Sequence, residues 1–228
     1  MFGLKKLGAS IAVVCLSFGM TQVAHAAVIN TVPVWDGSSS LSSWGGSGST
    51  STYGETFLAA GSTLNDFTFY VNTNGNTISA LAQVYAWSGA LGGHGPATGP
   101  ALFSSNVSVF GNGLQPITVN TGNLALTAGN EYVALLTVTD NSQAGGASWG
   151  LIWADSNVAN DGKVVWFNNN ANLSLLNSQA WDGPWINGSL AWTANFSNGA
   201  SHVPEPGSMA LVGLGILGAG IFRRKKTA

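Results

Sequence analysis

The central part of the chain consists of short segments in which apolar and polar residues alternate. In Asn65 to Val71, Phe67, Phe69 and Val71 alternate with more polar neighbours, and Leu190 to Phe196 repeats the scheme. A period of two is typical of a strand with one buried face. Further predicted strands are Ala80 to Trp87, Val107 to Phe110, Ile117 to Val119, Tyr132 to Thr139, Ser148 to Ala154 and Val164 to Phe167.

Clusters of Gly, Asn and Ser separate these segments, and no amphipathic helix of useful length lies between them. Many short strands with turn signals predict an all-β protein, with a single antiparallel β-sandwich or jelly-roll domain over residues 27–200. Tyr132 to Val138 is apolar on both faces, which predicts a central strand. Ser38 to Thr52 is rich in Ser and Gly and predicts a loop or a weakly paired edge, and Gly89 to Pro100 predicts a second loop.

The segment from Leu124 to Val133 has the pattern of a sandwich corner. A strand ends there, turns at Ala128-Gly129, and is followed by Tyr132. In such corners the tyrosine hydroxyl binds the backbone a few residues upstream, so we expect Tyr132 to have a structural role.

The first 26 residues have the three parts of a secretory signal peptide. Lys5 and Lys6 precede an apolar run, and Ala24 and Ala26 form a small-x-small cleavage site around His25. We therefore expect signal peptidase to cleave after Ala26. The chain's single cysteine is Cys15, so the mature protein would contain neither a thiol nor a disulfide.

Residues 201–228 form a second tripartite signal. Val203-Pro204-Glu205-Pro206 precedes an apolar run at 209–222, which ends at Arg223, Arg224, Lys225 and Lys226. The two prolines favour extended backbone around Glu205. A helix over 209–222 would be about 21 Å long against a hydrocarbon core of about 30 Å, so it predicts a marginal transmembrane helix. The four cations would act as a stop-transfer signal and remain cytoplasmic.

This order of motif, apolar helix and basic end resembles the PEP-CTERM sorting domain, also called the ice-binding protein C-terminal domain. The resemblance implies export in a Gram-negative bacterium and recognition of the tail by an exosortase, a membrane processing enzyme. It implies a precursor anchored in the inner membrane and a final place at the cell surface or in an extracellular, exopolysaccharide-containing matrix. It implies no ice binding. Parts of the central domain, such as Gly54 to Leu64, also look like jelly-roll domains that accompany such tails.

The charge of the central domain is strongly one-sided. It holds eight of the nine acidic residues but one of the seven basic residues, Lys163. Because such a surface repels phosphate backbones, nucleic acid is excluded as a partner.

The sequence shows no catalytic constellation, and we predict no catalytic residues, no metal and no cofactor. The mature chain has two histidines, His94 and His202, which lie far apart and beside no nucleophile motif. Asp155-Ser156-Asn157 with Asp161 could offer oxygens to Ca²⁺ but lacks the spacing of a Ca²⁺ loop.

All nine tryptophans lie in the central domain. Trp149 and Trp153 share one predicted strand face, and Trp192 alternates with Leu190 and Phe196, which predicts core positions. Trp181 and Trp185 flank a turn-rich Asp-Gly-Pro segment and are the candidates for an exposed glycan-binding pair, since indole faces stack on sugar rings.

The leading hypothesis is a non-enzymatic surface or matrix protein with structural or adhesive contacts and polysaccharide as a further partner. The main alternative is a dedicated carbohydrate-binding module, which should expose its tryptophans. A glycan-cleaving enzyme is the third alternative and requires two acids that face each other across a cleft.

Overall fold

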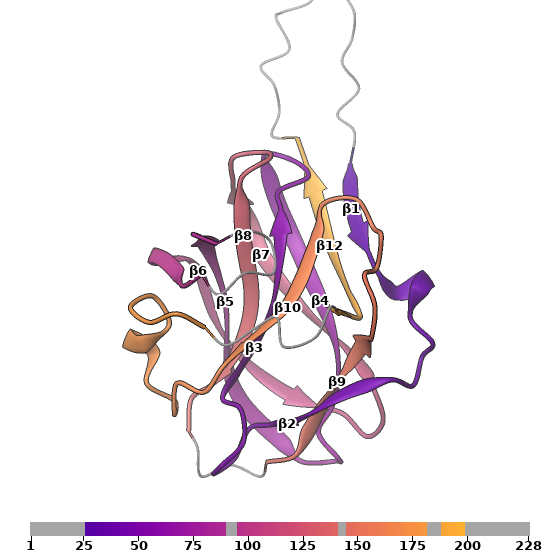
Figure 1. The fold of residues 1–228 in the computed structure, drawn as a ribbon, viewed down its shortest axis with the longest axis vertical. Helices are drawn as coiled ribbons and strands as arrows, with labels where there is room; N and C mark the ends of the chain where they lie inside the picture. The colour runs from indigo at the N-terminus through magenta and orange to yellow at the C-terminus, as the bar shows by residue number, and fades with distance from the viewer. Residues whose placement is uncertain (1–25, 90–94, 141–144, 182–187, 199–228) are drawn as a thin grey trace, which may run out of the picture. The chain divides into compact units, whose positions relative to one another are not determined.

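The computed structural model describes residues 26–89, 95–140, 145–181 and 188–198 (Figure 1). These residues form two antiparallel sheets and two short 3-10 helices, η1 (Val32–Val34) and η2 (Leu173–Leu175). The first sheet contains β1 (Ala27–Asn30), β2 (Ser40–Trp44), β4 (Thr63–Asn72), β7 (Gln115–Ala125), β9 (Ala147–Ile152), β11 (Ser189–Leu190) and β12 (Trp192–Ser197). The second contains β3 (Thr52–Leu58), β5 (Thr77–Trp87), β6 (Ala97–Phe110), β8 (Glu131–Val138) and β10 (Asp161–Phe167).

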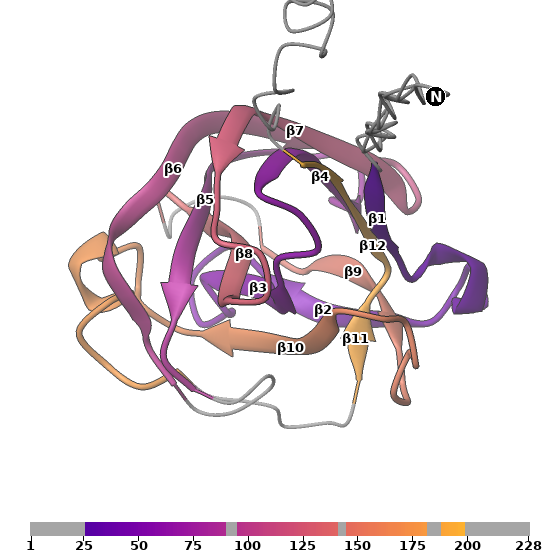
Figure 2. The same ribbon diagram turned by 90° about the horizontal axis from the view of Figure 1, so that it is seen from above.

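The order of strands places β4 at the centre of the first sheet. β4 pairs with β12, β7 and β9, while β1 pairs with β12, and β2 and β11 pair with β9. The second sheet has the order β10-β3-β8-β5-β6, so β10 and β6 are its two edges (Figure 2). All these pairings are antiparallel, which confirms the predicted all-β class.

Aromatic side chains from both sheets meet in the main core. Phe57 of β3 lies 5.6 Å from Trp192 of β12, measured between ring centroids, and Trp192 lies 5.9 Å from Phe69 of β4. All three side chains are fully buried. The alternation at 65–71 and at 190–196 therefore marks strand faces that pack between the two sheets.

Strand β8 is buried on both of its faces, as the sequence predicts. Ala134 and Leu136 face the main core, whereas Val133 and Leu135 belong to a second apolar cluster. That cluster also contains Leu176 and Trp181, which follow η2. The chain after β10 therefore supplies apolar side chains to a second core on the other face of β8, because successive strand residues point to opposite faces.

The predicted sandwich corner is also present. The backbone N–H of Thr127 donates a hydrogen bond of 2.9 Å to the hydroxyl of Tyr132, and the Tyr132 side chain is buried. The hydroxyl thereby satisfies a backbone donor in the turn between β7 and β8.

The structure differs from the predicted elements at several places. β2 and the start of β3 lie in the segment 38–52, which the sequence predicts as a loop or weak edge, and neither β1 nor the rest of β3 was predicted. β6 begins at Ala97, inside the predicted loop Gly89 to Pro100. The predicted strand 190–196 is split at Ala191 into β11 and β12. Thr31 explains the split, because its hydroxyl donates to the Leu190 carbonyl at 2.7 Å and accepts from the Trp192 N–H at 2.9 Å. The Thr31 side chain thus takes the place of a backbone hydrogen-bond partner between β11 and β12.

No helix within the described ranges is long and apolar enough to cross a membrane. The predicted transmembrane helix at 209–222 lies outside these ranges. The same holds for Ala24 of the signal peptide, for the sorting motif at 203–206 and for the basic end at 223–226. Ala26 is the first described residue and is exposed.

Candidate functional site

A groove of about 650 Å³ lies where the edges of the two sheets approach each other. One wall comes from β2 of the first sheet and the other from β10 of the second. Its lining combines aromatic and hydroxyl side chains: Ser40, Leu41, Ser42, Ser43, Thr50, Tyr53, Trp153, Val164 and Trp166.

A bulge shapes the hydroxyl wall of the groove. The pairing of β2 with β9 shifts by one residue between Leu41 and Trp44, so Ser42 and Ser43 occupy an expanded stretch of the strand. Ser43 has a φ of 75°, in the left-handed region that non-glycine residues rarely adopt. Two backbone hydrogen bonds close the following turn, one of 2.8 Å from the Thr50 N–H to the Ser43 carbonyl and one of 2.9 Å from the Gly45 N–H to the Thr50 carbonyl. The bulge therefore places three serines and Thr50 along one side of the groove.

Tyr53 connects the two walls beneath the groove. Its ring is buried on β3, and its hydroxyl donates a hydrogen bond of 2.9 Å to the Ser42 carbonyl of β2. Burial raises the pKa of this hydroxyl, so it stays protonated and can donate. This bond joins the second sheet to the bulged strand of the first sheet, which fixes the distance between the walls.

Two tryptophans form the aromatic side of the groove. Trp166 lies on β10 directly opposite Tyr53 in the strand register and is half-buried. Trp153 follows the end of β9 and is 56% exposed. The prediction that Trp153 shares a buried strand face with Trp149 is wrong, because β9 ends at Ile152 and the chain leaves the sheet there. The indole of Trp153 is therefore exposed to solvent.

The predicted exposure of Trp181 is also wrong. Trp181 is 1% exposed and belongs to the second core, where its ring stacks on Phe167 at 5.9 Å and meets Trp87 edge-on at 5.5 Å. Its indole N–H donates to the Leu176 carbonyl at 2.8 Å. Trp181 is therefore a packing residue, and Trp185, its predicted companion, lies outside the described residues. The local Asp-Gly-Pro pattern does not indicate that Trp181 is buried, because its burial depends on tertiary contacts with Phe167 and Trp87.

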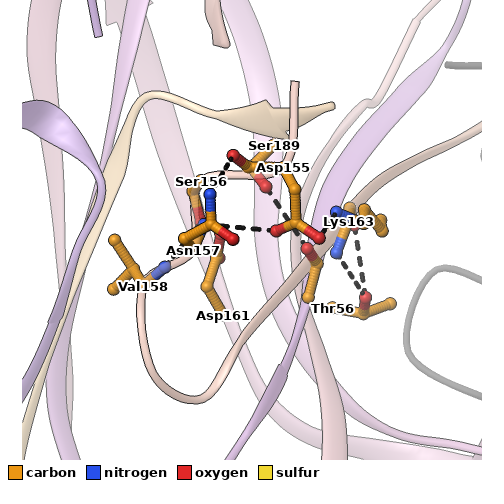
Figure 3. A network of polar contacts seen from close by, with 9 residues as sticks. Thr56, Asp155, Ser156, Asn157, Val158, Asp161, Lys163 and Ser189 are labelled. Carbon is orange, nitrogen blue, oxygen red and sulfur yellow. Dashed lines mark hydrogen bonds and ion pairs between the residues drawn. The ribbon is translucent and has the colours of Figure 1, made fainter. Parts of the chain in front are cut away.

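None of the described residues that line the groove carries a charge. Asp155 and Lys163 lie near lining residues in sequence and form an ion pair of 3.0 Å between the Asp155 carboxylate and the Lys163 ammonium (Figure 3). The hydrogen bond from the Lys163 side chain, together with the Asn157 N–H, lowers the pKa of Asp155. Each charge of this pair is offset by the other.

The candidate Ca²⁺ oxygens are engaged in the same polar network. Asp161 accepts hydrogen bonds from the Ser156 hydroxyl and, at 2.8 Å, from the indole N–H of Trp192 (Figure 3 shows the first). Asp155 accepts from the Asn157 N–H at 3.2 Å. Across the described ranges, no group of three or more His, Cys, Asp or Glu residues is placed to hold a metal ion.

A buried carboxyl lies behind the groove. Glu55 is fully buried on β3, and its cross-strand partner on β10 is Val164, which lines the groove. One carboxyl oxygen of Glu55 accepts the Leu190 N–H at 2.8 Å, and the other has no hydrogen-bond partner within the described part of the chain. Burial, then the nearby charge of Asp161, raises the pKa of Glu55 well above its usual range, although the Leu190 N–H and the charge of Lys163 oppose the shift. Glu55 therefore favours its neutral form and links β3 to β11.

Glu55 and Asp161 are the acidic pair that the structure brings close enough to interact electrostatically. Burial likewise raises the pKa of Asp161, against hydrogen bonds from Ser156 and Trp192. Neither residue lines the groove, so they do not form two acids that face each other across it.

Comparison with known proteins concerns the C-terminal tail. A family model described as the PEP-CTERM protein-sorting motif matches residues 202–226. This match confirms the predicted sorting tail and indicates an exported, membrane-processed protein of Gram-negative bacteria that is a substrate of an exosortase. No curated protein and no solved structure matches the chain.

Proposed function

We propose that this chain is a non-enzymatic cell-surface or extracellular-matrix protein whose β-sandwich adheres to polysaccharide through the groove between β2 and β10. The observation that carries the proposal is Trp153, a large aromatic side chain that is 56% exposed at the mouth of a groove. Trp153 and Trp166 line the same groove together with hydroxyl side chains, and an apolar patch with a polar rim is typical of a ligand-binding groove.

The chemistry of the lining favours an uncharged glycan. The indoles of Trp153 and Trp166 offer apolar faces for the C–H surfaces of sugar rings. Ser40, Ser42 and Ser43 also line the groove, and their hydroxyls can exchange hydrogen bonds with sugar hydroxyls. An anionic polysaccharide would find no cation in this lining and would be repelled by the acidic domain.

The position of the groove, not its size, favours a polysaccharide segment over a small enclosed ligand. Its volume of about 650 Å³ lies within the range of about 300–1,000 Å³ that is usual for small-molecule sites. The groove lies along the margins of two sheets, so a longer chain can continue past it at either end. The sorting tail supports the same setting, since the exported protein would meet matrix polysaccharide.

A glycan array tests the proposal. The exported protein should bind uncharged glycans and ignore anionic ones, and Trp153→Ala should abolish binding because it removes the exposed stacking face. Trp35→Ala is the matched control, since Trp35 is also a partly exposed tryptophan but packs on Tyr70 at 5.5 Å and does not line the groove. Equal loss in both variants, or hydrolysis of the bound glycan, would contradict the proposed role.

A further inference from the structure

Strand β6 is a long sheet edge without a partner on one side. Among the described elements it pairs with β5 alone, and Figure 2 shows it on the outer side of β5. Its stretch Ala101 to Phe110 contains no charged residue, no proline and no glycine. Natural proteins protect exposed edges with charges, prolines or bulges, and this stretch has none of these from residue 103 onward.

The hydrogen-bond pattern fixes which backbone groups face the open edge. The Ser79 carbonyl of β5 accepts a hydrogen bond from the N–H of Thr139, which follows β8. The backbone N–H and C=O of Ser79 therefore point toward β8 and away from β6. Ser79 is the cross-strand partner of Ser108, and strand residues alternate in direction. The N–H and C=O groups of Ser104, Asn106 and Ser108 therefore point away from β5 toward the open edge. Within the described part of the chain, the Ser105 hydroxyl donates a hydrogen bond of 3.5 Å to the Asn106 carbonyl.

The side-chain pattern of this edge is symmetric about Asn106. Leu102 and Phe110, four residues to either side, are 42% and 57% exposed. Ser104 and Ser108, two residues to either side, are exposed and polar. An antiparallel copy centred on Asn106 would therefore place Leu102 opposite Phe110 and Ser104 opposite Ser108. It would pair apolar with apolar and polar with polar, and it brings no like charges together.

We propose that β6 pairs with β6 of a second copy of this chain, antiparallel and centred on Asn106, so that the five-stranded sheet continues across a two-fold axis. Such an interface is isologous, because each residue contacts its symmetric counterpart. The main-chain groups of Ser104, Asn106 and Ser108 supply the hydrogen bonds, and the two Leu102–Phe110 pairs bury apolar surface at both ends. Self-association on a face separate from the groove would let one matrix protein cross-link two polysaccharide segments.

Engineered cysteines test both the pairing and its register, since the chain's single cysteine, Cys15, lies in the predicted signal peptide. In the proposed register the Cα atoms of residue 106 in the two copies lie about 5.5 Å apart, within the range of about 4.4–6.8 Å that a disulfide spans. Exported Asn106→Cys should therefore form a disulfide-linked dimer under mild oxidation. Ser108→Cys is the matched control, because its two copies would lie about 14 Å apart and should stay unlinked.

A mixture of Ser104→Cys and Ser108→Cys proteins should form the heterodimer, since these positions face each other in the proposed register. Light scattering on the cysteine-free protein should give twice the mass of one chain, and Phe110→Lys should return it to a single chain with an unchanged circular dichroism spectrum. The proposal would be overturned if Ser108→Cys alone formed a disulfide-linked dimer, or if Asn106→Cys formed no more of the dimer than Ser108→Cys does. Linking of Asn106→Cys to a different protein would also overturn it, because the edge would then accept a foreign strand.

Discussion

Trp153 and Trp181 are the same residue type in opposite environments. Trp181 packs against Phe167 and Trp87, whereas more than half of the Trp153 side chain contacts solvent. The sequence predicts the reverse, a buried strand face for Trp153 and an exposed turn for Trp181. The burial of Trp181 could not be predicted, because it comes from the tertiary contact between the segment after β10 and the second sheet. Exposure of a single aromatic residue thus depends on partners that are distant in the chain.

The two tryptophans should respond differently to truncation. Trp181→Ala removes a buried indole from the second core and should lower the free energy of unfolding by about 3–5 kcal/mol. Trp153→Ala should change it by less than about 0.5 kcal/mol, since surface substitutions away from packed features have small effects. Urea denaturation of both variants measures the difference, and similar losses would show that Trp153 is a packing residue.

Glu55 predicts a dependence of stability on pH. Its pKa in the folded state is raised, chiefly by burial, so the folded state holds this proton more tightly than the unfolded state. The resulting stability is fully present below the carboxyl's ordinary pKa and is lost as the pH rises through the raised value. Asp161, whose pKa is also raised, acts in the same direction.

Glu55→Gln should therefore unfold at a higher temperature than the wild type at alkaline pH and should flatten the decline with pH. The amide keeps an oxygen that can accept the Leu190 N–H but has no charge to bury. Thermal unfolding from pH 4 to pH 9 gives both curves. Parallel curves for the two proteins would mean that folding does not raise the pKa of Glu55.

At the scale of elements, strands that follow simple alternation could be predicted, whereas β3 could not. β12 alternates throughout, β4 alternates from Asp66 to Val71, and both match the prediction within a few residues. β3 contains Thr52, Glu55 and Thr56, all buried. Thr52 is satisfied by the Thr137 hydroxyl at 2.7 Å, a contact that links β3 to β8. Because such partners lie far away in sequence, polar residues on both faces hid this strand.

The corner before β8 was predicted from sequence and gives an element-scale test. Tyr132→Phe keeps the ring in the core and removes the acceptor of the Thr127 N–H. The loss should cost about 1 kcal/mol of unfolding free energy, the usual net value of one hydrogen bond. Chemical denaturation measures it, with Tyr70→Phe as control, since Tyr70 is partly exposed and outside the corner. An equal effect in both variants would show that the Tyr132 hydroxyl does not stabilise the corner specifically.

At the scale of the whole molecule, the sorting tail could be identified from sequence alone and the groove could not. The tail is one continuous stretch whose order of parts carries its meaning, and the family match covers it. The groove collects residues from four separate stretches, at 40–43, 50–53, 153 and 164–166, and depends on a bulge at Ser43. No local sequence pattern predicts a site that is assembled from separate stretches by the tertiary structure.

We expect the tail to act through its extended motif and its cations. Alanine at Pro204, Glu205 and Pro206 should leave insertion intact but accumulate a membrane-bound precursor, because the exosortase would lose its recognition segment. Serine at the four cations of 223–226 should release full-length protein, because the stop-transfer charge is gone. Pulse-chase fractionation in the native host separates the two outcomes. Normal processing of the alanine variant would show that the motif is dispensable.

Affinity electrophoresis tests the adhesive groove most directly. The exported protein is run through native gels that contain increasing amounts of the host's own exopolysaccharide, beside Trp153→Ala and the control Trp35→Ala. The proposed function predicts that migration of the wild type and of the control slows with polysaccharide concentration, while Trp153→Ala migrates as in an empty gel. Equal retardation of all three proteins would place binding elsewhere, and no retardation of the wild type would contradict polysaccharide adhesion itself.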